Sequence, residues 1–517
     1  MPCGARTAVG AGALCAALGL GVPLGSLAAQ CPDGTAPPCR SRAPSGGATT
    51  VAILYFDNLS PDTADAYLAD GVTEELIVRI GAVPRLSVKS RYAVRRFRAQ
   101  PARDPAELGH ELGVTYLVTG SVRRSGDHVR VTAELMRAGS GVRVWGDVYD
   151  RSEGDLLSLQ TDLARDLASG IIGRLAPTEQ ARLATLPTRN APAYEHFLRG
   201  NFALAQRSPA ALVRALGEYQ EALALDPDFS TARARLALGY AVFFAWGWRH
   251  PSLPAESLLS RGLAAARMAL QRDSTSSDAW MAYGIVVWLL QPRTIDAALS
   301  AQRRSLAIDP GNAEAANMLG VMLFNLGRDS AAAEALHRAL AIEPGRPITL
   351  TRLAEIAWLS GRYPDARRLL DSAVTVAPTF YVAYEDRAWV LLHFRDTTAA
   401  RADAETALRL APEDFESGRG VLAAVQAAEG DTLRARTGLD SLLASLDRLN
   451  QIRHVQVFNV AMPLVALGDT GRALDLIERV RPRAMMLWWS LRWPELNPLR
   501  VSPRFRRIVD EASPGAP

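Results

Sequence analysis

Lysine is almost absent from this sequence. Lys89 is the single lysine among 58 basic residues, so the remaining 57 are arginine. A Walker A phosphate loop needs a glycine directly before its lysine, and Val88 stands there instead, which excludes that loop. A Schiff-base lysine would also have to be Lys89. The 58 basic and 54 acidic side chains leave a net charge of +4, so bulk charge gives no reason to expect a nucleic-acid partner.

Histidine and cysteine are also scarce, which limits catalysis and metal binding. No two histidines lie at metal-ligand spacing, and the sequence has no CxxC pair, no HExxH helix, no GxSxG elbow and no GxGxxG turn after a strand. We therefore expect no enzymatic activity, no metal site and no cofactor. The seven histidines are His110, His128, His196, His250, His337, His393 and His454.

Long apolar runs are missing except at the start of the chain. The run from Ala8 to Ala29 consists mainly of Ala, Gly, Leu and Val, follows a single charge at Arg6, and ends in small residues. This pattern is typical of a secretory signal peptide. We expect it to cover residues 1–29, with cleavage after Ala28 or Ala29. An uncleaved membrane anchor is the alternative, which the glycines and the proline of the run disfavour.

A Pro/Gly/Ser-rich linker follows, over residues 30–49. Cys3 and Cys15 would leave with the signal peptide, whereas Cys31 and Cys39 remain and flank the segment CPDGTAPPC. An exported chain meets an oxidising compartment, where a disulfide closing this short loop can form. Two free thiols are the alternative, and the sequence does not decide between them.

Residues 50–178, called the N-terminal domain below, show the alternation of a small mixed sheet with helices. The apolar run Val51–Phe56 suits a strand buried on both faces, and turn-forming residues follow it at Asp57–Pro61. Alternating valines predict a half-exposed antiparallel strand at His128–Met136. The predicted order β-α-β-α-β-β-β-α comprises strand 51–56, helix 65–80, strand 86–88, helix 105–112, strands 115–122, 128–136 and 142–149, and helix 155–175.

Four long segments of this domain carry a family resemblance. They are VAILYFDNLS, YLADGVTEELI, ELGVTYLVTGSVRRSGDHVRVTAELM and GVRVWGDVYDRSEGDLLSLQTDLARDLASGI. In this order they resemble the TolB amino-terminal-like (FlgO/CsgG-like) domain. The resemblance implies a small α/β module without established catalytic residues, which bacterial chains often place before helical repeats.

One segment of the domain is strongly basic. The segment from Arg85 to Arg103 contains seven basic residues and no acidic residue, and Tyr92 and Phe97 are interleaved with them. Such a segment could bind an anion, a lipid headgroup or an acidic partner. The alternative, which we favour, is a solvated connection whose arginines pair with acids on neighbouring helices. This candidate anion patch comprises Arg85, Lys89, Arg91, Arg95, Arg96, Arg98 and Arg103.

A 34-residue period dominates the rest of the chain. Pro310, Pro344, Pro378 and Pro412 follow one another at this spacing, each after a small-residue helix ending such as SLAIDP or ALAIEP. A 34-residue period with this ending is typical of tetratricopeptide repeats. We expect seven or eight such repeats over residues 188–485, so the chain as a whole is mostly helical. Each hairpin alone cannot bury its apolar face, so neighbouring hairpins must stack.

The last segment, residues 486–517, has no period. It contains Trp488, Trp489, Trp493 and Phe505. We expect it to cap the last exposed face of the stack, because a terminal repeat would otherwise leave apolar surface in water.

Stacked hairpins leave a surface lined by the first helix of each repeat. Counting in register places several aromatic side chains at equivalent positions of these helices. They could bind an extended peptide or an apolar helix, or they could pack between repeats, which is the commoner role of aromatic residues at helical spacing. The Lys/Asn clamp for a terminal carboxylate is missing. The candidate peptide groove comprises Trp288, Phe324, Trp358, Trp389 and Asn317.

These features predict an exported, periplasmic or envelope scaffold, membrane-anchored if the signal is not cleaved. Its repeats would bind partner proteins that the sequence does not identify, and its N-terminal domain would dock a second partner or an envelope component. One alternative is a sensor with a ligand pocket formed by Asp57, Asn58 and the basic segment. A hydrolase is a further alternative, and it would need a cleft with a histidine beside Ser or Asp.

Overall fold

The computed structural model describes residues 48–95, 97–98, 104–290, 295–411, 418–448, 457–480 and 487–513. The predicted signal peptide, most of the linker, Cys31 and Cys39 lie outside these ranges, as do Arg96, Arg103 and Pro412. Within them, no helix combines the length and the apolar character that crossing a bilayer requires.

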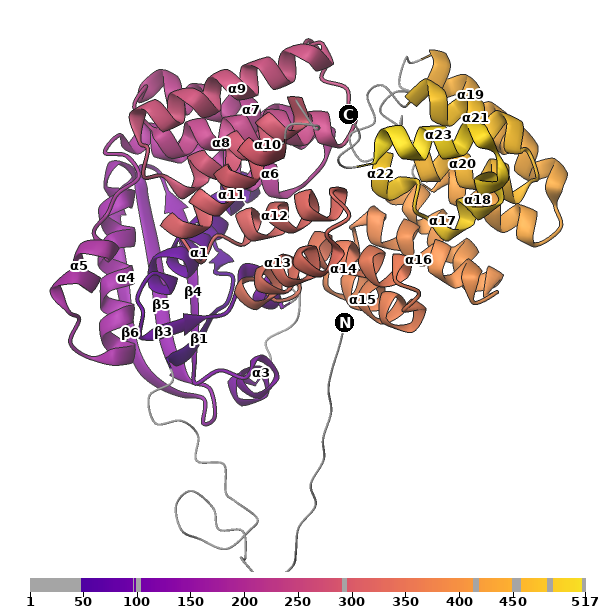
Figure 1. Cartoon of the computed structure of the whole chain (residues 1–517). Helices are drawn as coiled ribbons and strands as arrows, with labels where there is room; N and C mark the ends of the chain where they lie inside the picture. Colours follow the sequence, from indigo (N-terminus) through magenta and orange to yellow (C-terminus); the bar gives the residue numbers. More distant parts are fainter. Residues whose placement is uncertain are drawn as a thin grey trace, which may run out of the picture. The chain divides into compact units, whose positions relative to one another are not determined.

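The N-terminal domain is built on one mixed sheet, as predicted. Its order is β3-β1-β4-β5-β6, and the short strand β2 also pairs with β4 (Figure 1). Strands β3 and β4 run parallel to β1, whereas β4, β5 and β6 form an antiparallel meander. The strands are β1 (Thr49–Ile53), β2 (Asp57–Asn58), β3 (Leu86–Val88), β4 (Tyr116–Ser125), β5 (His128–Arg137) and β6 (Val142–Ser152).

The turn predicted after the first strand is partly wrong. Asp57 and Asn58 form β2, which pairs in parallel with Ser121 and Val122 of β4. The side chain of Asn58 still behaves as in a turn, because its Oδ1 accepts a hydrogen bond of 3.0 Å from the backbone N–H of Ser60.

Helices cover both faces of the sheet at β1. Val51 and Ile53 of β1 face the core shared with the long helices, whereas Ala52 between them faces a second, smaller core that contains Val94 and Leu108. The strand is therefore buried on both sides, as its continuous apolar run predicts. The helices are α1 (Ala66–Gly81), α2 (Arg91–Arg95), α3 (Pro105–Leu112), α4 (Leu156–Ile172) and α5 (Pro177–Leu183).

Eight helical pairs follow in the described parts of the chain. The first helices are α6 (Ala191–Ala205), α8 (Ser230–Ala245), α10 (Ser277–Leu290), α12 (Ala313–Asn325), α14 (Pro347–Leu359), α16 (Tyr381–His393), α18 (Arg419–Ala428) and α20 (Val457–Ala466). The second helices are α7 (Pro209–Leu225), α9 (Ala255–Arg272), α11 (Ile295–Ile308), α13 (Asp329–Ile342), α15 (Tyr363–Val376), α17 (Thr397–Leu410), α19 (Thr432–Arg448) and α21 (Thr470–Val480).

Described turns inside these pairs contain a residue in the left-handed conformation. Gly327 and Gly361 have φ angles of +68° and +73° between their helices, which glycine adopts without steric cost. Arg395 and Arg207 stand at the corresponding turns with φ of +59° and +51°. A side chain in this region costs about 1 kcal/mol, so surrounding contacts must hold these two arginines in place.

The C-terminal segment contacts two parts of the repeat array. It comprises α22 (Leu487–Ser490), the 3-10 helix η3 (Pro494–Val501) and α23 (Pro503–Ala512). Arg504 of α23 donates to Glu478 of the last pair at 2.7 and 2.6 Å. The segment also returns to α12, where the ring of Trp489 stacks on Phe324 with centroids 5.7 Å apart.

The N-terminal domain packs against the repeats through several hydrogen bonds. The Tyr67 hydroxyl of α1 donates to Glu195 of α6, and the Tyr194 hydroxyl donates to Gln160 of α4 at 2.7 Å. Farther along the chain, Ser90 donates to the carbonyl oxygen of Pro344 at 3.3 Å. The domain is thus attached to the first pair and to the turn before α14.

Candidate functional site

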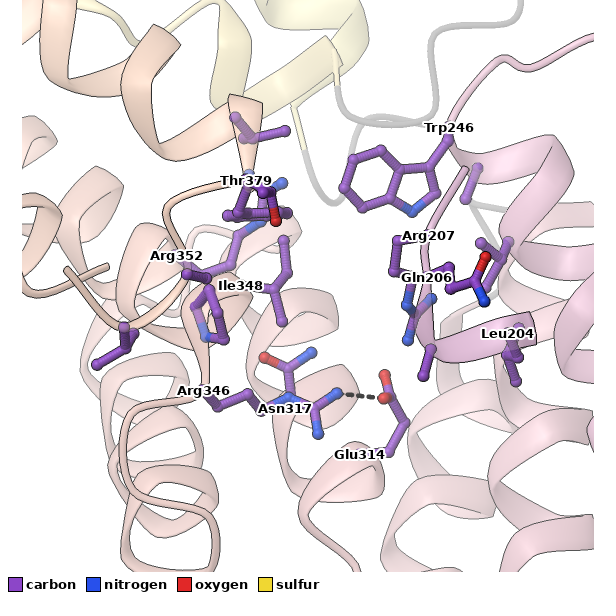
Figure 2. A pocket seen from close by; sticks show the side chains of 18 of the residues that line it. Leu204, Gln206, Arg207, Trp246, Glu314, Asn317, Arg346, Ile348, Arg352 and Thr379 are labelled. Atoms are coloured by element: carbon purple, nitrogen blue, oxygen red, sulfur yellow. Dashed lines mark hydrogen bonds and ion pairs between the residues drawn. The ribbon is translucent and has the colours of Figure 1, made fainter. Parts of the chain in front are cut away.

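A cavity of about 850 Å³ lies against the first helices of six consecutive pairs. Helices α6, α8, α10, α12, α14 and α16 all contribute side chains, and the N-terminal domain adds Glu74, Arg91, Arg95, Arg98 and Glu111. This size falls within the range of pockets that hold a small ligand or a short segment of chain. Figure 2 shows Leu204, Arg207 and Trp246 on one side of it, and Ile348, Arg352 and Thr379 on the other.

Much of the cavity wall is apolar. The ring of Trp246, just after α8, contacts the rings of Phe380 and Tyr381 edge-on, with centroids 6.2 and 6.0 Å apart. Residues before α16 therefore meet the end of α8 at this wall. The other apolar lining side chains of the first helices include Leu238, Val242, Ile285, Trp288, Leu289, Met318, Val321 and Ile348.

A partly buried ion pair joins two neighbouring repeats at the cavity. Arg346 is buried and donates to Glu314 of α12 and, at 2.7 Å, to Glu343. Burial alone would raise the pKa of Glu314, but Arg346, Arg207 and Arg91 outweigh it and lower this pKa to about 2. Glu314 is therefore a carboxylate at any physiological pH.

A second charged group lies on α14 and α16. Arg352 donates to Glu355, and its guanidinium carbon lies 5.8 Å from the ring centroid of Trp489. Asp386 stands beside this pair on α16, and both Glu355 and Asp386 are only 2% exposed. Neither carboxyl oxygen of Asp386 has a hydrogen-bond partner in the part of the chain that the structure describes.

The pKa values of these two carboxyl groups are both raised. Burial raises the pKa of Asp386 well above its ordinary value, Glu355 and Glu385 add to the rise, and Arg352 opposes it. Burial likewise raises the pKa of Glu355 against the opposing effect of Arg352. An unpaired carboxylate in such a place is costly, so Asp386 holds its proton unless a cation approaches.

The structure separates the predicted anion patch into two parts. Arg91, Arg95 and Arg98 line the cavity, and Arg98 pairs with Asp70 at 2.6 Å. Arg85 instead pairs with Glu179 of α5 at 2.6 Å, and Lys89 follows β3 and does not line the cavity.

Acidic residues also lie near Arg91, another cavity arginine of this segment. Arg91 lies 3.6 Å from Glu74 and 3.9 Å from Glu343. Burial raises the pKa of Asp70, the partner of Arg98, to about 6, although Arg98 opposes the rise.

The predicted peptide groove is also divided. Trp288 and Asn317 line the cavity, and Asn317 accepts a hydrogen bond of 2.8 Å from Thr349. Phe324, Trp358 and Trp389 are buried in the interior, where a peptide in the cavity would not reach them. The C-terminal segment covers Phe324 with Trp489, and Trp358 with Trp493 at 5.9 Å between centroids.

Glu355 and Asp386 are the site residues that the sequence reasoning missed, although a signal was present. Arg352 and Asp386 stand one and two repeat lengths of 34 residues after Met318, and Glu355 stands one length after Val321. Charged side chains at positions that are apolar in the repeat of α12 indicate a departure from packing. The period alone could have drawn attention to them.

The comparisons with known proteins confirm the repeats. Residues 293–347 and 330–384 match family models described as tetratricopeptide repeat. The chain is also 27% identical over 226 residues to a putative adenylate cyclase 3 of Rhizobium meliloti (strain 1021). This match covers 44% of the chain and 38% of the relative, so it spans less than two fifths of that protein.

Several solved structures are similar to parts of the chain. PilF of Pseudomonas aeruginosa is 19% identical, with 43% of this chain and 91% of PilF covered and a TM-score of 0.33. PilW, a type IV pilus biogenesis factor, is 19% identical, with 42% and 92% covered and a TM-score of 0.34. Yeast Tom70 is 14% identical, with 62% and 67% covered and a TM-score of 0.38.

Proposed function

We propose that this chain is an exported, non-enzymatic scaffold that binds a segment of a partner protein against the first helices of its repeats. The N-terminal domain, which resembles the TolB amino-terminal-like domain, docks a second partner or an envelope component. The main observation in favour of a partner site is the cavity, because the first helices of six consecutive pairs line it. Repeat arrays bind extended segments across such a series of equivalent helices.

The lining supports a protein segment as occupant. Apolar side chains such as Trp246, Trp288 and Ile348 offer contact area, and charged groups at both ends of the row fix direction and register. In the described ranges, no group of three His, Cys, Asp or Glu residues could hold a metal ion.

A ligand-sensing function is the second candidate, and one observation favours it. The cavity is lined by Arg91, Arg95 and Arg98 of the N-terminal domain as well as by the repeats. A small ligand bound there would contact both parts and could couple them. Asp57 and Asn58, the pocket residues predicted for this function, do not line the cavity.

Site-specific photo-crosslinking tests the scaffold function. We expect p-benzoylphenylalanine in place of Ile348, which lines the cavity, to capture one reproducible partner protein in the native host. The matched control replaces Met268 on the second helix α9, which is 42% exposed and does not line the cavity. Equal capture from both positions, or capture from neither, would contradict a partner site at the cavity.

Export is tested separately. Amino-terminal sequencing of the protein isolated from its host should show a chain that starts after Ala28 or Ala29. A full-length chain in the cytosolic fraction would contradict export.

A further inference from the structure

We infer that the cavity contains a binding site for the cationic side chain, arginine or lysine, of the partner segment, formed by Asp386 and Glu355. This inference rests on the proposed function and adds to it the chemistry of the residue that the partner must present. It follows from three observations: a buried carboxyl group without a partner among the described residues, an excess of acid beside it, and several cavity arginines that pair with other acids.

The first observation is the unsatisfied carboxyl group. Both oxygens of Asp386 and the Oε2 atom of Glu355 have no hydrogen-bond partner among the described residues, and both side chains line the cavity. Buried polar atoms in native proteins nearly always find a partner, so three such oxygens on two adjacent helices need an explanation. A guanidinium or ammonium group supplies several N–H donors at once.

The second observation is the local charge. Among the described residues, Arg352 is the cation that lowers the pKa of Asp386, against the carboxyl groups of Glu355 on α14 and Glu385 on its own helix α16, which raise it. Glu385 accepts a hydrogen bond from the backbone of Gly418 at 3.3 Å, so it is committed to the turn before α18. The guanidinium of Arg352 thus faces three carboxyl groups, and a bound cation would reduce this excess of acidic groups.

The third observation is that nearby arginines are held by other acids. Arg346 bonds Glu314 and Glu343, and Arg98 bonds Asp70. Arg352 is fixed by Glu355 and lies over Trp489. Each of these arginines already neutralises a nearby acid. If one of them rotated to pair with Asp386, the carboxylate that it left would be without its partner.

Apolar lining on the same two helices suits the stem of a long cationic side chain. Ile348 of α14 and Tyr381 and Val382 of α16 line the cavity together with Asp386. Arginine and lysine place their methylene groups on such surface while the charged head reaches a carboxylate. A charge-assisted hydrogen bond at these buried side chains is stronger than one in water.

Binding must release a proton, which provides a signature. The free protein keeps Asp386 protonated because burial raises its pKa, with Glu355, Glu385 and Arg352 as the charged groups that face it. A cation favours the carboxylate, so the proton of Asp386 leaves as the cation binds. Affinity for the cation therefore falls as the pH falls.

Isothermal titration calorimetry on the full chain tests the inference with three probes. The first is the capped pentapeptide acetyl-Ala-Leu-Arg-Leu-Ala-amide, the second is its citrulline twin, which keeps the shape but not the charge, and the third is free agmatine. The variants are Asp386→Asn and, as a matched control, Asp371→Asn, an exposed aspartate on α15 outside the cavity. Buffers of different ionisation enthalpy report the proton that leaves.

We expect the arginine peptide to bind the wild-type protein about tenfold or more tightly than its citrulline twin, with proton release. Asp386→Asn should lose this preference, and Asp371→Asn should retain it. Binding of agmatine but not of the peptide would support the cation site and overturn its assignment to a protein partner.

Equal affinity for the two peptides, no effect of Asp386→Asn, or no binding of any probe at millimolar concentration would overturn the inference. Proton release is measured on the wild-type protein, so the test does not depend on the folding of a variant. The crosslink from Ile348 tests the proposed function independently, because it captures a partner whatever the charge of its residues.

Discussion

Arg492 forms a two-bond salt bridge with Asp329, although 163 residues separate them in the sequence. Its Nη1 atom donates to Asp329 Oδ1 at 3.0 Å, and Nη2 donates to the second oxygen. Asp329 begins α13, so this pair fastens the C-terminal segment to the middle of the repeat array. The segment therefore stabilises more than the last repeat, and it holds Trp489 over Phe324 and beside Arg352.

Replacing Trp489 with alanine should lower the free energy of unfolding by about 3–5 kcal/mol. The ring is fully buried between Phe324 and Trp493, so its loss leaves a cavity in the contact between distant segments. Urea denaturation followed by circular dichroism measures the change. Leu433→Ala on α19 is the control, because that side chain is 78% exposed and should change stability by no more than about 0.5 kcal/mol. Equal effects of the two substitutions would show that the segment does not support the array.

The repeats could be predicted because their determinants are local and periodic. Pro310 and Pro344 end second helices at a fixed spacing, and small residues such as Ala332 and Ala366 lie where the helices of a pair meet. The alternating valines of β5 gave the sheet an equally local pattern. By contrast, the two residues of β2 are too few to show any period, so their pairing with β4 was missed.

The contacts of the C-terminal segment could not be predicted in this way. Nothing near Phe324 or Trp358 in the sequence indicates that Trp489 and Trp493 will cover them, because the pairing joins distant parts of the chain. The register count placed the aromatic residues correctly on the first helices, but it could not say what packs on them. The position of Asp386 in the period was readable, whereas its lack of a partner is a property of the packed structure.

Glu314→Gln should destabilise the protein by about 3 kcal/mol at neutral pH. The substitution removes a carboxylate from the buried guanidinium of Arg346, which still pairs with Glu343. Arg346 and its neighbours lower the pKa of Glu314 from the ordinary 4.5 to about 2. The stabilisation is therefore complete above about pH 4.5 and is lost as the pH falls toward 2.

Denaturant unfolding of the wild-type protein and of Glu314→Gln at several pH values tests this expectation. The two stabilities should differ most at neutral pH and converge in acid. Asp365→Asn is the control, since its pairs with Arg362 and Arg368 are exposed and should contribute no more than about 1 kcal/mol. A constant difference between wild type and Glu314→Gln from neutral pH to pH 2 would contradict the assigned ionisation.

The effect of Asp386→Asn on stability should depend on pH in the opposite direction to that of Glu314→Gln. Burial, with Glu355 and Glu385 adding and Arg352 opposing, raises the pKa of Asp386, so the folded state holds a proton that the unfolded state has released. The contribution of Asp386 to the free energy of unfolding therefore falls as the pH rises above about 4. Asparagine removes this contribution, so the stability of the variant relative to the wild-type protein should increase as the pH rises above about 4. Denaturation without added cation measures this increase, and a variant that loses relative stability over this pH range would show that Asp386 is ionised and paired in the folded protein.

Glycine-to-alanine substitution should have opposite effects at Gly420 and Gly217, although both glycines lie in helices. A Cβ atom on Gly420 of α18 would lie 1.6 Å from the backbone oxygen of Asn459 in α20, so the two helices would have to separate. Such overpacking costs about 1–3 kcal/mol. At Gly217 of α7 a Cβ atom meets nothing within 4 Å, and alanine should stabilise the helix by about 0.5–1 kcal/mol because it restricts the unfolded chain. In thermal denaturation, the midpoint temperature should be lower for Gly420→Ala and higher for Gly217→Ala than for the wild-type protein. A rise for both would mean that α18 and α20 do not approach this closely, and the stacking of the last pairs would then rest on side chains alone.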